Sequence, residues 1–116
     1  LDFECIRVQL EHYKAVGCDH KEKSCCYYNW SEIDIASCRR QFCYHDCDEK
    51  RPLNEHEMNQ KLASYLRQHK KDGELCHKVG DERYDFVLDI KPSQHLCVRA
   101  FGKIVNVSYA KIQQAA

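Results

Sequence analysis

The sequence predicts an α+β fold, in which cystine-tied N-terminal helices are followed by a small antiparallel β-meander of three to four strands. Apolar residues recur at helical spacing up to Gly73, whereas apolar and polar residues alternate after it. Nine cysteines in 116 residues suggest the cystines, since this content is typical of small exported proteins. The length is that of one domain, so we expect residues 1–116 to form a single disulfide-stabilised extracellular domain.

The first helix is predicted over residues 3–16. Four apolar residues are spaced to share one of its faces: Phe3, Ile6, Leu10 and Tyr13. Asp2 is placed to cap its first turn, and Gly17 is placed to end its last turn. The polar, cysteine-bearing stretch up to Asn29 is expected to be a loop.

A second helix is predicted from Ser31, because Asp34 stands three residues on in a variant of the capping box. No glycine or proline interrupts the segment up to Cys47. At about 100° per residue its apolar positions form two groups, which indicates a helix packed on both sides. The groups are Ile33, Ala36, Cys43 and Cys47, and Ile35, Cys38 and Phe42.

A third helix is predicted after Pro52, which ends the second. Asn54 and Glu57 have the spacing of a capping box. The apolar positions follow at helical spacing, and we expect the helix to continue toward Gly73. They are Met58, Leu62, Tyr65 and Leu66.

Three strands are predicted after Gly73, with a fourth if residues 75–79 pair with them. KPSQ, residues 91–94, is expected to be a turn between the first two of the three. The alternating apolar residues are Phe86, Leu88 and Ile90, then Leu96, Val98 and Ala100, then Val105, Val107 and Tyr109.

The cysteines are expected to be oxidised, because the sequence contains no CxxC pair of the kind that structural zinc sites use. We favour a bridge between Cys76 and Cys97. Cys5 is then the odd cysteine, available for a disulfide-linked homodimer. The eight cysteines assigned to cystines are Cys18, Cys25, Cys26, Cys38, Cys43, Cys47, Cys76 and Cys97.

The motif CYHDC, residues 43–47, is a candidate for chemistry. On a helix Cys43 and Cys47 share a face while His45 points about 160° away, so the three cannot surround one metal ion. We therefore expect no metal and no other cofactor.

The His45-Asp46 pair beside cysteines on the second helix resembles the active helix of secreted phospholipase A2 enzymes, over residues 31–47. The resemblance implies calcium-dependent lipid hydrolysis, in which His45 activates water and Asp46 binds calcium. Gly17 is the only glycine ahead of His45, so the glycine-rich calcium loop of that family is missing. We expect a protein that is not an enzyme, and a degenerate phospholipase A2-like hydrolase is the alternative.

The partner is expected to be an extracellular or cell-surface protein. Eighteen basic and eighteen acidic residues give no net charge, which favours neither nucleic acid nor anionic lipid, and the apolar runs are too short to span a membrane. The predicted binding surface is Tyr27, Tyr28 and Trp30, because aromatic side chains on a rigid loop offer contact area at low entropic cost. Core packing is the alternative role for these rings.

Two acceptor motifs, Asn29-Trp30-Ser31 and Asn106-Val107-Ser108, predict N-linked glycans on Asn29 and Asn106. The chain starts at Leu1 without a methionine, as expected of a mature protein whose signal peptide is removed or of a trimmed chain. These features together predict a secreted, non-enzymatic protein-binding module of the toxin, immune-modulating or ectodomain type.

Overall fold

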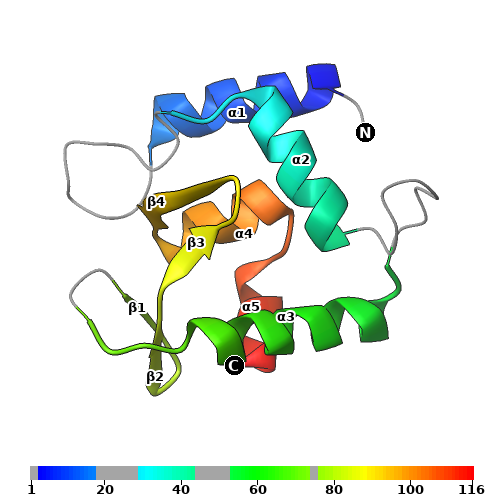
Figure 1. Cartoon of the computed structure of the whole chain (residues 1–116). Coiled ribbons are helices and arrows are strands. Elements are labelled where there is room, and N and C mark those ends of the chain that lie inside the picture. The colour runs from blue at the N-terminus through cyan, green and yellow to red at the C-terminus, as the bar shows by residue number, and fades with distance from the viewer. Residues whose placement is uncertain (1–2, 18–28, 44–52, 74–75) are drawn as a thin grey trace.

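The computed structural model describes residues 3–17, 29–43, 53–73 and 76–116 (Figure 1). Within these ranges the chain forms five helices and two small antiparallel sheets, so the predicted α+β class is confirmed. In chain order the elements are α1 (Phe3–Val16), α2 (Glu32–Cys43), α3 (Glu55–His69), β1 (His77–Val79), β2 (Glu82–Tyr84), β3 (Phe86–Leu88), β4 (Lys91–Leu96), α4 (Val98–Val105) and α5 (Tyr109–Ala115).

The end of α1 and the starts of α2 and α3 carry the local signals that the sequence predicts, whereas Asp2, expected to cap α1, lies outside the described residues. Gly17 has a φ of 80° and ends α1, with its amide donating to the Tyr13 carbonyl at 2.8 Å. Ser31 caps α2: its hydroxyl accepts from the Asp34 amide at 3.3 Å, and the Asp34 carboxylate accepts from the Ser31 amide at 3.0 Å. Asn54 and Glu57 form the complete capping box of α3. This helix ends at His69, before Gly73.

α2 buries one of its two predicted apolar groups. Ile35, Cys38 and Phe42 are buried, and Ala36 is buried with them, but Ile33 is 67% exposed. The expectation for Ile33 was wrong because α2 packs against α1, α3 and α4 with the opposite side of the helix. Of the other residues in that group, Cys47 and the side chain of Cys43 lie outside what the structure describes.

The predicted three- to four-stranded meander is wrong, because the strands form two separate hairpins. β1 pairs with β2 around Gly80, whose φ is 62°. β3 pairs with β4, placing Phe86 opposite Leu96 and Leu88 opposite Lys91 with an irregular register between them. The turn falls at residues 89–90, so the predicted turn KPSQ lies within β4.

The last two predicted strands are helices α4 and α5. A strand with Leu96, Val98 and Ala100 on its buried face would turn Phe101 to the other side. As a helix, α4 buries Ala100, Phe101, Ile104 and Val105 together. The sharp corner after α4 requires Gly102, because a Cβ there would lie 2.7 Å from the Val107 carbonyl oxygen.

α4 lies in the middle of the molecule, between α1 and α2 on one side and α3 and α5 on the other (Figure 1). It packs against α2, α5 and β3, and its Phe101 ring stacks on Tyr65 of α3. The largest fully buried side chains of this core are Trp30, Ile35, Leu62, Leu66, Val79, Phe86, Leu96, Phe101, Ile104, Val105 and Ile112.

No disulfide joins the cysteines whose side chains the structure describes, which are Cys5, Cys38, Cys76 and Cys97. The expected bridge between Cys76 and Cys97 is not formed; the Cys97 sulfur instead caps α4 by accepting from the Ala100 amide at 3.4 Å. Apolar packing rather than cystines therefore joins the described elements. Among the other predicted half-cystines, Cys18, Cys25, Cys26, Cys47 and the Cys43 side chain lie outside the described residues.

Candidate functional site

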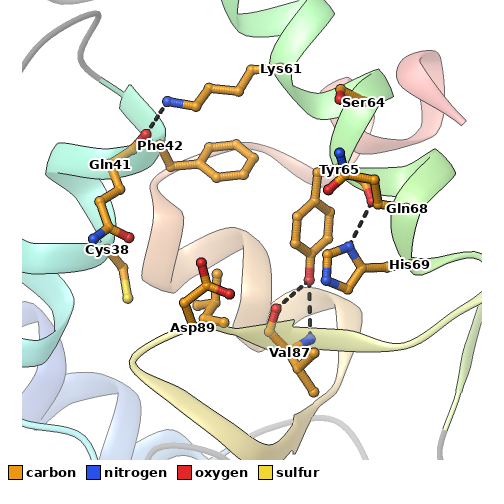
Figure 2. Close-up of a pocket in the computed structure, with 11 residues that line it drawn as sticks. Cys38, Gln41, Phe42, Lys61, Ser64, Tyr65, Gln68, His69, Val87 and Asp89 are labelled. Atoms are coloured by element: carbon orange, nitrogen blue, oxygen red, sulfur yellow. Dashed lines mark hydrogen bonds between the residues drawn. The ribbon is translucent and has the colours of Figure 1, made fainter.

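A pocket of about 300 Å³ opens between α2, α3 and the β3–β4 hairpin (Figure 2). Each helix contributes residues at spacings of three and four, which place them on one face. We call this pocket the α2–α3 groove. It is lined by Cys38, Gln41 and Phe42 of α2, by Lys61, Ser64, Tyr65, Gln68 and His69 of α3, and by Val87, Leu88 and Asp89.

One wall of the groove is a stack of aromatic rings. The Tyr65 ring is stacked on His69 at 3.9 Å between centroids and on Phe101 at 4.8 Å, with an interplanar angle of 17° in both pairs. The Phe42 ring meets Tyr65 edge to face at 5.9 Å. Rings held on several sides lose little further freedom on binding, so this wall is preorganised.

The Tyr65 hydroxyl connects α3 to the strand wall of the groove. It donates to the Val87 carbonyl at 2.7 Å and accepts from the Val87 amide at 3.0 Å. Burial raises the pKa of the Tyr65 phenol well above its usual range; the hydrogen bond from Val87 opposes this, and the carboxylates of Asp85 and Asp89 add to it. The phenol therefore stays neutral, and it satisfies both backbone hydrogen-bonding groups of Val87 on β3.

Cys38 lies on the α2 side of the groove and is buried. Burial, aided by the charges of Asp34 and Asp89, raises the pKa of its thiol to about 12. Because the thiolate is the nucleophilic form, Cys38 is unreactive at neutral pH.

His69 stands at the end of the aromatic stack (Figure 2). Its Nδ1 lies 2.8 Å from the Tyr65 carbonyl, which can only accept, so Nδ1 carries the hydrogen. A second histidine, His95, places Nδ1 2.6 Å from an Asp85 carboxylate oxygen. The Asp85 amide in turn donates to the His69 carbonyl at 2.8 Å. This hydrogen bond between Asp85 and His69 anchors the β3–β4 hairpin to the end of α3.

The two charged residues of the groove, Lys61 and Asp89, differ in their surroundings. The Lys61 ammonium donates to the Gln41 carbonyl and lies 5.9 Å from the centre of the Phe42 ring. Asp89 is exposed after β3, with its carboxylate directed toward the aromatic side chains (Figure 2). After burial, the Asp89 carboxylate adds to the raised pKa values of the Cys38 thiol and the Tyr65 phenol, so its negative charge acts on both of these groove residues.

The binding residues predicted from the sequence do not line the groove where the structure describes them. Trp30 is 2% exposed and belongs to the core, with the Lys91 ammonium 5.7 Å from its ring centre. Core packing, the alternative role, therefore accounts for Trp30. Tyr27 and Tyr28 lie outside the described residues, as do His45 and Asp46 of the alternative hydrolase.

Both predicted glycosylation sites are exposed. Asn29 lies in a turn before α2. The alternating pattern had suggested that Asn106 lies on the outward face of a strand. It is instead the C-cap of α4, with φ 62° and ψ 47°. Cys5, the predicted odd cysteine, is exposed on α1.

Sequence reasoning did not select the residues of the groove as functional. It placed Cys38 in a cystine and gave Phe42, Tyr65 and Leu88 only as apolar positions. The available signal was on α3, where Lys61, Ser64 and Gln68 interrupt the apolar face next to Tyr65. A helix face that carries both polar and aromatic residues is typical of a partly open surface. The opposite wall could not be located without the packing of α2 and the hairpin.

None of the helices in the described part of the chain is long and apolar enough to cross a membrane. Over the same residues, no group of three or more histidine, cysteine or acidic side chains is arranged to hold a metal ion. Comparisons with protein-family models, curated proteins and solved structures found no match for this chain.

Proposed function

We propose that this chain is a secreted, non-enzymatic protein-binding module, of the toxin, immune-modulating or ectodomain type, that recognises another protein through the α2–α3 groove. The observation that carries the proposal is the groove itself, which combines a preorganised aromatic wall with polar side chains at its rim. Interface anchors bind in pockets of this kind, where an inserted side chain is desolvated and its backbone is held by the rim.

The size and chemistry of the groove suit a side chain from a protein better than a reaction. A volume of about 300 Å³ is at the lower end for ligand pockets and accommodates one or two side chains. Two groove residues with ionisable groups used in catalysis, Cys38 and Tyr65, are held neutral by burial. Gln41, Ser64 and Gln68 supply hydrogen-bond donors and acceptors for the backbone of a bound segment.

Filling the groove should weaken peptide binding strongly. Dodecapeptides selected from a random phage library on the purified chain are expected to bind Ser64→Trp about tenfold or more weakly than the wild type, because the indole occupies the space between the helices. Asn59→Trp is the matched control, since Asn59 is exposed on α3 and does not line the groove.

Isothermal titration of synthetic peptides measures the change, and circular dichroism checks that both variants are folded. Failure to select any peptide would contradict the proposed function. Equal affinity of the selected peptides for the wild type and Ser64→Trp would do so as well.

Secretion is supported by the exposure of both acceptor asparagines, Asn29 and Asn106. The cysteines support it less than their number suggested, because the four described side chains form no disulfide. Cys5 is exposed on α1, and a disulfide-linked homodimer through it remains part of the proposal.

Expression of the chain behind a signal peptide in eukaryotic cells should yield a protein with two N-linked glycans, because both asparagines are accessible in acceptor motifs. Glycosidase treatment should increase the electrophoretic mobility, and Asn29→Gln and Asn106→Gln should each remove one glycan. A secreted protein that carries no glycan, or retention of the chain in the cell, would contradict this assignment.

A further inference from the structure

We propose that the α2–α3 groove receives a basic side chain of the partner protein, arginine in the first place, whose stem lies against Phe42 and Tyr65 and whose cationic head pairs with Asp89. This inference rests on the proposed function, since it names the chemistry that the same groove recognises.

The first argument is the unbalanced charge of Asp89. The neighbouring acids are already engaged: Asp85 lies 2.6 Å from His95, and Asp34 lies 3.8 Å from the Lys91 ammonium. Asp89 has no ion-pair partner within the described part of the chain, and it is exposed. A carboxylate at the mouth of a pocket attracts a cation, and partial desolvation on binding strengthens the resulting hydrogen bonds.

The second argument concerns Lys61, which could attract an anion to the same groove. Its ammonium already donates to the Gln41 carbonyl and lies over the Phe42 ring at the α2 end. The Asp89 carboxylate, by contrast, acts on the groove walls: after burial, its charge adds to the raised pKa values of the Cys38 thiol and the Tyr65 phenol. A cation is therefore favoured at the Asp89 end, away from Lys61 (Figure 2).

The third argument is the shape of a long basic side chain. Arginine and lysine bury an aliphatic stem along apolar surface while the charged head stays hydrated or paired. The side chains of Phe42, Tyr65 and Leu88 offer that apolar surface beside Asp89. Arginine is preferred over lysine, because its planar guanidinium can pair with both oxygens of a carboxylate.

The peptides selected for groove binding are the probe. They are expected to share a basic residue, arginine in the first place, at one position. Replacing that arginine by citrulline, its neutral isostere, should weaken binding to the wild type about tenfold. With the Asp89→Asn variant of the protein, the same replacement should lower the affinity less than about twofold, because the carboxylate that pairs with arginine is absent. Asp81→Asn is the control, because Asp81 is an exposed acid in the β1–β2 turn. This variant should lose as much affinity on the citrulline replacement as the wild type.

The outcomes separate the two proposals. Selected peptides that bind in the groove through an acidic or purely apolar anchor would overturn this inference and leave the proposed function standing. An unchanged citrulline penalty in Asp89→Asn would overturn it in the same way. Peptides that ignore Ser64→Trp, or the absence of any selected peptide, would instead remove the proposed function.

Discussion

Replacement of Arg39 by alanine will lower the free energy of unfolding by about 3 kcal/mol or more. Arg39 is a residue of α2 and is 6% exposed, and its side chain reaches both α1 and α4. Its Nε donates to the Ile104 carbonyl at 3.1 Å, one terminal nitrogen donates to the Lys103 carbonyl at 2.9 Å, and the other donates to the Gln9 side chain at 3.0 Å.

The size of this effect follows from the position of the guanidinium at the C-terminal end of α4. Carbonyls in the last turn of a helix carry partial negative charge and have no partner within the helix. Hydrogen bonds with a charged donor each contribute about 1.5–3 kcal/mol, and alanine leaves buried carbonyls without a partner. Arg39→Lys should retain part of the stability, because lysine keeps the charge and loses the planar fork.

Urea denaturation followed by fluorescence measures the loss, since Trp30 is the single tryptophan and is buried. Arg40→Ala is the matched control, because Arg40 is exposed and makes a cation–π contact with Phe3 at 5.9 Å. Its cost should be at most about 1 kcal/mol. Equal destabilisation by the two variants would show that Arg39 does not hold the three helices together.

The second large effect is expected from Phe101→Ala, which should cost about 3–5 kcal/mol. Phe101 is fully buried, and its ring centroid lies 4.8 Å from Tyr65, 5.0 Å from Phe86 and 5.8 Å from Phe42. Alanine leaves a cavity at the centre of this cluster, behind the aromatic wall of the groove.

Phe101→Leu tests whether the cavity causes the loss of stability. Leucine fills most of the volume of the phenylalanine side chain, so this variant should cost less than about 1.5 kcal/mol. The control is Phe3→Ala, since Phe3 is 42% exposed. Thermal and urea unfolding of the three variants rank their losses in the free energy of unfolding. A cost for Phe101→Ala no greater than that for Phe3→Ala would mean that α4 is not the centre of the core.

Local signals predicted the first three helices well. Ser31 with Asp34, Asn54 with Glu57, and Gly17 act through hydrogen bonds and dihedral angles within a few residues, so they are readable in the chain. The groove is different, because its walls come from three segments, and only their packing brings residues as far apart as Cys38 and Asp89 together.

The second half of the chain shows where a local pattern is ambiguous. Leu96, Val98 and Ala100 alternate like a strand, yet the same segment with Phe101 and Ile104 also presents an apolar helix face. Burial of Phe101 among rings from α2, α3 and β3 selects the helix. Tertiary packing thus overrides the alternation, as β-propensity depends strongly on context.

The sequence by itself determined the α+β class, the starts of α2 and α3, the end of α1, and the presence of acceptor motifs at Asn29 and Asn106, since these depend on neighbouring residues. Tertiary structure alone decided the helices α4 and α5, the burial of Trp30 and the absence of the expected bridge between Cys76 and Cys97. It also formed the α2–α3 groove, because the charge of Asp89 and the rings of Phe42 and Tyr65 make one surface only where two helices and a hairpin pack together.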